Sequence, residues 1–102
     1  MTKGIVLKFS KREYFTLLEL LERTILQDAS KTAEDRLLIA ILLNVYKKVH
    51  NKAIELKDKY TLTLKAEEAI AFYLYYREIE PITIYENRLI LITIEATDKH
   101  LL

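Results

Sequence analysis

The chain contains no cysteine and no tryptophan, and only one glycine and one proline among its 102 residues. Without cysteine it can form no disulfide, no thiolate metal site and no cysteine nucleophile. With glycine only at position 4, a glycine-rich phosphate-binding loop is excluded as well. Folds rich in β-hairpins need such residues at their tight turns, so their scarcity favours a mainly helical fold.

Long apolar runs and net charge are also lacking. The longest wholly apolar run, 37–43, has seven residues, whereas a membrane-crossing helix needs about 20. The apolar stretch before Lys8 is too short for the core of a signal peptide. A formal net charge of +1 gives no overall attraction to polyanions. With 51% hydrophobic and 30% charged residues, we expect one folded domain over residues 1–102, soluble and cytoplasmic, with no membrane partner.

Hydrophobic periodicity predicts one strand and two helices in the first half. Apolar residues alternate over 5–9, the period of a strand with one buried face. Ser10, with a glutamate three residues later, has the capping-box pattern that starts a helix, and apolar spacing extends that helix to about Gln27. Thr32 caps the next helix, which no breaking residue interrupts before Tyr60.

This second helix is expected to be the central one. Residues 37–43 are apolar on every side, so we expect neighbouring elements to surround them, with Leu42 deepest in the core. Further along, Glu55 and Lys59 have the four-residue spacing of a helical ion pair.

The second half repeats the alternation and then becomes ambiguous. Residues 60–64 predict a second short strand, paired with the first, and 66–79 a third helix that ends before Pro81. The segment 82–95 is rich in β-branched residues and is compatible with a β-hairpin. We predict a helix over 83–100 instead, because apolar residues there share one helical face and because the segment resembles the second helix.

That resemblance belongs to a weak internal repeat. The strand-to-helix junction at 7–18 recurs at 62–73, and the Glu-x-Arg-Leu start of the second helix recurs 52 positions later. Only four of sixteen aligned pairs from these two helices are identical, and any two amphipathic helices share a hydrophobic pattern, so coincidence stays open. If the repeat reflects a duplication, its two units are residues 5–49 and 60–101. The predicted fold is a compact, mainly α domain of four helices and two short paired strands, in the order β-α-α-β-α-α.

Residues able to perform catalysis are few. The chain has two serines and two histidines. Ser10 and Ser30 occupy predicted cap and loop positions, His50 lies beside lysines on a helix surface, and His100 is near a helix end. We therefore expect no catalytic residue, no metal site, no cofactor and no small-molecule substrate, and hence no enzyme.

Aromatic residues crowd the third helix. At 100° per residue the rings cannot all face one core, so part of the set is expected at an interface, where tyrosine is enriched. The alternative is that the rings lie over the domain's own surface. The candidate interface residues are Phe72, Tyr73, Tyr75 and Tyr76.

A basic stretch on the second helix is the other candidate surface. Lysines clustered on one helix face can contact phosphates, although the wet side of a long helix often has such charges and acidic residues interrupt these. The candidate polyanion contacts are Lys47, Lys48, Asn51 and Lys52. We expect a non-enzymatic interaction or scaffold module that forms a homodimer, with nucleic acid an unlikely partner; the alternative is a small nucleic-acid-associated regulator that uses this basic face.

Overall fold

The structure is a computed structural model that describes residues 4–27 and 32–101. Within these residues the elements are β1 (Ile5–Ser10), α1 (Lys11–Thr24), α2 (Ala33–Ala53), β2 (Lys59–Leu64), α3 (Ala66–Tyr76) and α4 (Ile84–Leu101). The predicted mainly helical fold and its element order are confirmed, and the two strands pair antiparallel. The C-terminal segment is a helix and not a hairpin. Ser30 and the predicted connection around it lie outside the described residues.

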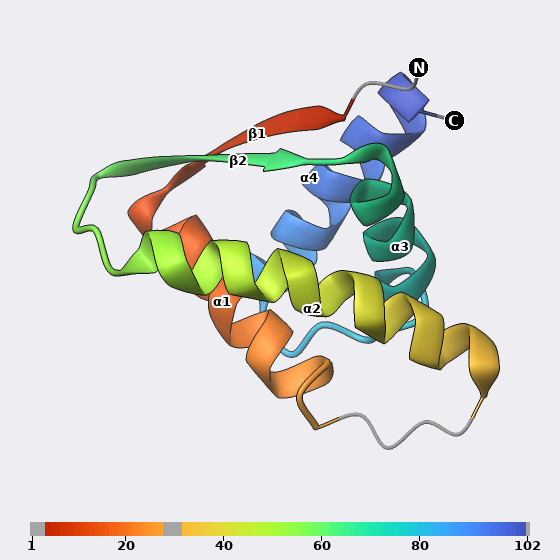
Figure 1. The fold of residues 1–102 in the computed structure, drawn as a ribbon. Helices are drawn as coiled ribbons and strands as arrows, with labels where there is room; N and C mark the ends of the chain where they lie inside the picture. The colour runs from red at the N-terminus through yellow and green to blue at the C-terminus, as the bar shows by residue number, and fades with distance from the viewer. Residues whose placement is uncertain (1–3, 28–31, 102) are drawn as a thin grey trace.

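The two strands form a layer with one buried and one open face. Ile5 pairs with Leu64 and Phe9 with Tyr60, so that the apolar residues of both strands point the same way. In Figure 1 the helices lie on that side of the sheet, and the C-terminal end of α4 rises beside the start of β1. The opposite face is open, and Val6 on it is 60% exposed. The alternation read from the sequence therefore predicts the sheet face correctly.

The helix α1 begins where its capping pattern predicts. The Ser10 hydroxyl accepts from the backbone N–H of Glu13, and the Glu13 carboxylate accepts from the N–H of Ser10 at 2.8 Å. One turn later the Tyr14 ring stacks on that of Tyr60, with centroids 4.2 Å apart. The Tyr14 hydroxyl donates to the carbonyl of Val49, which lies on α2. Tyr14 thus joins α1, α2 and β2 in the core.

A polar cluster fixes the start of α4 against α1. The Glu86 carboxylate accepts from Arg23 at 2.5 Å and from the N–H of Ile82 at 3.0 Å, and the Thr83 hydroxyl caps the N–H of Glu86. Farther along α4, the buried Thr93 donates its hydroxyl to a carbonyl one turn earlier. Tertiary packing and these local bonds therefore make a helix of a segment whose β-branched residues alone suggest strands.

The second helix is shorter than predicted. It ends at Ala53 and not near Tyr60, because the chain must turn back to pair β2 with β1. The Tyr60 hydroxyl closes this turn, donating to the carbonyl of Glu55 and accepting from the N–H of Lys57. The predicted helical pair of Glu55 with Lys59 is accordingly wrong, and Glu55 pairs with Lys57 at 2.7 Å instead. Two other helices also end early, α1 at Thr24 and α3 at Tyr76, each followed by a turn.

The prediction that residues 37–43 are surrounded on every side is wrong. Leu42 is fully buried, as expected, but Leu37 is 63% exposed and Ala40 is exposed as well. The other residues of the run are half-buried. This N-terminal half of α2 projects at the lower right of the fold in Figure 1, so the neighbouring helices cover one side of it only.

Candidate functional site

The aromatic residues of α3 lie mostly inside the molecule. Phe72 and Tyr76 are each 1% exposed and Tyr75 is 6% exposed, whereas Tyr73 is partly exposed. The expectation that these rings cannot all face one core holds for Tyr73 alone, because α3 packs against α2, α4 and β2 at once and the other three rings are buried. Tyr76 also bonds its hydroxyl to that of Thr24 at 2.7 Å. Of the four predicted interface residues, only Tyr73 is partly exposed.

The lysines of the basic stretch on α2 differ in what they contact. Lys48 donates to the Glu68 carboxylate at 2.6 Å and to the carbonyl of Thr63 at 3.3 Å, and Lys52 donates to the carbonyl of Thr61. These two lysines therefore tie α2 to the outer edge of β2. Lys47 is exposed.

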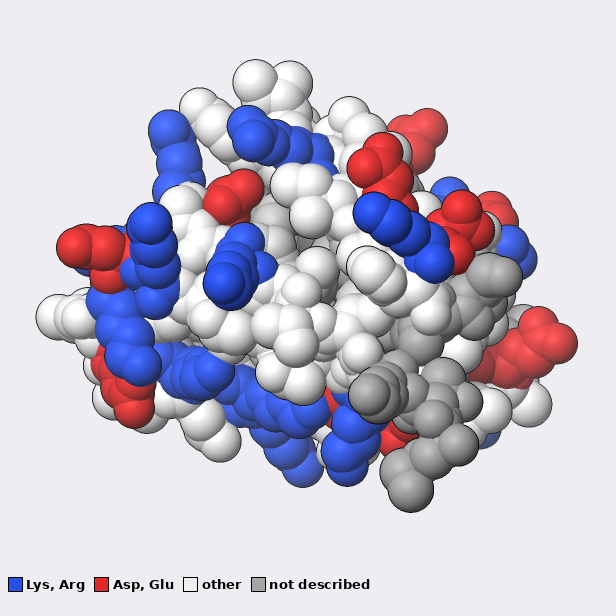
Figure 2. Space-filling view, turned by 90° about the horizontal axis from the view of Figure 1, so that it is seen from above, with Lys and Arg blue, Asp and Glu red and all other residues white. Residues whose placement is uncertain are grey.

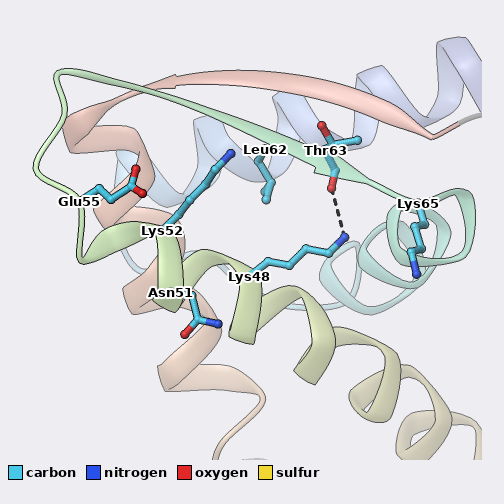
Figure 3. A pocket seen from close by; sticks show the side chains of 7 residues that line it. All are labelled: Lys48, Asn51, Lys52, Glu55, Leu62, Thr63 and Lys65. Atoms are coloured by element: carbon cyan, nitrogen blue, oxygen red, sulfur yellow. Dashed lines mark hydrogen bonds between the residues drawn. The ribbon is translucent and has the colours of Figure 1, made fainter.

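A groove of about 550 Å³ lies between α2 and β2. Figure 3 shows Lys48 and Lys52 reaching from α2 towards the strand, with Lys65 at the opposite end, where α3 begins. The predicted Asn51 also lines this groove, but Lys47 does not. Three of the four predicted polyanion contacts are thus brought together.

Two further hollows meet at Ser10, the end of β1. The first, which we call the strand hollow, has about 530 Å³ and its lining includes Lys8, Ser10 and Lys59. The second, the arginine hollow, has about 260 Å³ and its lining includes Ser10, Arg12 and Arg88. Because both share Ser10, they are adjacent.

Inside the arginine hollow, the Arg12 guanidinium lies over the ring of Tyr85, 4.2 Å from its centroid. Glu13 lines both hollows, and its carboxylate is engaged by the N–H of Ser10. Tyr85 itself is 44% exposed.

Basic residues around the sheet were missed at the sequence level. Figure 2 looks onto the open face, and Lys and Arg side chains gather along its left and lower edges. The strand alternation over 5–9 already placed Lys8 outward, so that signal was available in the sequence, whereas Lys59, expected in the second helix, lies on β2. Arg12 and Arg88 belong to helices far apart in the chain, and only the tertiary fold brings them together.

The buried phenols are held in their protonated form. Burial, assisted by the nearby Tyr60, raises the pKa of Tyr14 to about 12, and burial also raises the pKa of Tyr76. Among residues 4–27 and 32–101, no three His, Asp or Glu side chains form a group that could hold a metal ion. No helix in the same residues is long and apolar enough to cross a bilayer.

Comparison of the chain with models of protein families, with curated proteins and with solved structures found no match. A functional assignment therefore depends on the surfaces described above.

Proposed function

We propose that the chain is a non-enzymatic interaction module that forms a two-fold homodimer through the exposed face of α2. The observation that carries this proposal is the apolar N-terminal half of that helix. Leu37 is 63% exposed within a run of seven apolar residues, and Ala33 and Ala40 are exposed on the same helical face. This face takes the place of the tyrosine helix, whose rings are mostly buried.

The charges on α2 favour a second copy as the occupant. The first turn of the helix is acidic, with Glu34, and its C-terminal half is basic, with Lys47 exposed. In an antiparallel pair of α2 helices that cross near Ala40, Glu34 of each protomer lies towards Lys47 of the other. Ala40 is small and allows the two backbones to approach closely.

The dimer is expected to be weak. A stable interface buries about 800 Å² on each partner, and the exposed apolar stripe of one helix half is smaller than that. We therefore expect a dissociation constant in the micromolar range, about 1 to 10 μM.

Sedimentation equilibrium over a range of protein concentrations tests this proposal. We expect Leu37→Glu and Ala40→Glu to give a monomer at about 100 μM, where the wild type is largely dimeric. Leu91→Glu is the matched control, because Leu91 is 48% exposed on α4, away from this face. A wild type that is monomeric at that concentration, or a control that dissociates equally, contradicts the proposed interface.

We also propose that the two halves arose by duplication. Three observations support this for the strand and the first helix of each half, at an offset of 55 positions. Glu68 accepts from the N–H of Lys65 at 2.8 Å, as Glu13 does from Ser10. The buried residues of the two strands correspond. The buried residues Leu17, Leu20 and Leu21 of α1 correspond to Phe72, Tyr75 and Tyr76 of α3.

The second helix of each half corresponds differently. The fully buried residues of α2 match buried residues of α4 at an offset of 48 positions and not 52: Leu42 with Ile90, Val45 with Thr93, and Val49 with Thr97. The duplication predicts related sequences in which the two halves align with higher identity than here. The offset should be 55 positions for the strand and first helix of each half and 48 positions for the second helix. Relatives whose halves diverge completely would argue for coincidence.

A further inference from the structure

We propose that the open face of the sheet, with its adjoining groove and hollows, binds the phosphate backbone of a single-stranded nucleic acid. This surface is distinct from the dimer face of α2. It differs as well from the predicted basic stretch, because most of its cations come from β1, β2 and the helices that follow or flank them.

The cations follow a continuous path. At one end the groove has Lys52 and Lys65, and β2 leads from there to the strand hollow, which has Lys59 and Lys8. The arginine hollow, which has Arg12 and Arg88, adjoins the strand hollow through their shared lining. A strand of six residues is about 20 Å long, so these charges extend over several nucleotides of an extended chain.

Three carboxylates near this path are already engaged, whereas Asp58, exposed beside Lys59, offsets part of the positive charge. Glu68 is 3% exposed and holds Lys48, Glu55 holds Lys57 at 2.7 Å, and Glu13 is engaged by the backbone at the start of α1. The outward residues of the two strands include no acid. The charge of the open face is therefore positive although the whole chain is nearly neutral.

The arginine hollow adds a platform for a base. Proteins that bind single strands combine a positive groove with aromatic rings on which unpaired bases stack. Tyr85 lines the hollow and is 44% exposed, and the Arg12 guanidinium lies over one face of its ring, so a base would stack on the opposite face. A paired duplex cannot present its base faces to this ring. An anionic membrane is favoured less, since these cations line concave hollows and do not surround an apolar protrusion.

Fluorescence anisotropy with a labelled oligonucleotide of about 15 unpaired nucleotides tests this proposal. Six phosphate contacts on a single strand predict a slope of about −4 for the logarithm of affinity against the logarithm of salt concentration. Raising salt from about 50 to 200 mM is thus expected to weaken binding by a few hundred-fold. We expect Lys8→Glu and Arg88→Glu each to weaken binding about ten-fold at low salt.

Two controls separate this site from general charge. Arg77→Glu makes the same change in net charge at the end of α3 and should alter affinity less than about two-fold. Tyr85→Leu should weaken binding about five-fold or more but leave the salt slope unchanged, because it removes stacking alone. An equal loss with Arg77→Glu, or tighter binding to vesicles of phosphatidylserine than to the oligonucleotide, would overturn the proposal.

Discussion

Lys48 on α2 lies 2.6 Å from the carboxylate of Glu68 on α3, and this carboxylate is almost completely buried. The same Lys48 ammonium donates to the carbonyl of Thr63, and Lys52 donates to that of Thr61. Backbone carbonyls on the outer edge of β2 are thereby occupied by lysines. Lysine on an exposed strand edge is one of the devices that prevent another strand from pairing there. The ion pair of Lys48 with Glu68 therefore joins α2 to α3, and the bonds from the two lysines to strand carbonyls protect the edge of β2.

Breaking this pair from the lysine side should be costly. Lys48→Met leaves the Glu68 carboxylate buried without its cation, which we expect to lower the free energy of unfolding by about 1–3 kcal/mol. The value is below that of a fully buried pair because the Lys48 side chain is 38% exposed. Urea denaturation at protein concentrations below the dimerisation range measures the change, and Lys47→Met at an exposed position should shift it there by less than about 0.5 kcal/mol.

A double-mutant cycle tests whether the effect of Lys48→Met comes from this pair. In a Glu68→Gln background, the same Lys48→Met substitution should cost less than about 1 kcal/mol, since no buried charge remains to be stranded. An equal cost in both backgrounds would show that Lys48 stabilises the fold by packing or by its bond to the strand carbonyl.

Two leucines of the apolar run of α2, five positions apart, should differ in how much stability is lost when each is replaced by alanine. Leu42 is fully buried, and Leu42→Ala should cost about 2–5 kcal/mol in denaturant melts. Leu37 is 63% exposed, and Leu37→Ala should cost less than about 1 kcal/mol when measured below the dimerisation range. A loss below 1 kcal/mol for Leu42→Ala would show that this residue is not central.

Local patterns in the sequence identified the elements but not their ends. The capping pair of Ser10 and Glu13 and the strand alternation are interactions within a few residues, so the sequence contains them in full. The end of α2 depends on Tyr60, whose hydroxyl bonds a turn that exists only because Tyr60 on β2 pairs with Phe9, 51 residues away. Such a determinant is tertiary, and helix propensity does not report it.

The candidate sites show the same difference between local sequence patterns and features that depend on tertiary packing. The aromatic residues of α3 are a sequence pattern, but their burial depends on three elements that pack around one helix. Likewise, the exposure of Leu37 follows from the neighbouring helices covering only one side of α2. Arg12 and Arg88 line the same hollow because α1 and α4 pack together.

Tyr14 should make the fold sensitive to high pH. Its pKa is raised from 10.0 to about 12 by burial first and by Tyr60 second. Because the folded pKa lies above the unfolded one, this stability is complete below about pH 10 and is lost as the pH rises towards 12. We therefore expect the melting temperature to fall steeply between about pH 10 and pH 12.

Tyr14→Phe separates the hydrogen bond of this residue from the effect of its ionisation on stability. The variant loses the hydrogen bond to the carbonyl of Val49 and should be less stable by about 1 kcal/mol at neutral pH. Its stability should fall less at alkaline pH, so the difference from the wild type should narrow. Tyr85→Phe, at a partly exposed ring, should leave the alkaline fall unchanged. A constant difference at every pH would exclude Tyr14 as a source of the alkaline loss.

The single glycine marks a close approach between the two strands. A Cβ atom at position 4 would meet the carbonyl oxygen of Leu64 and would lie 3.2 Å from the Cα of Lys65. Both are backbone atoms, which cannot rotate away as a side chain can, so Gly4→Ala must displace the start of β1 or the end of β2. We expect a loss of about 1–3 kcal/mol by urea denaturation, as for overpacking in a core. Val6→Ala, on the open face of the same strand, should cost less than about 1 kcal/mol. If Gly4→Ala is as stable as the wild type, the strands do not approach this closely, and the glycine has no steric role here.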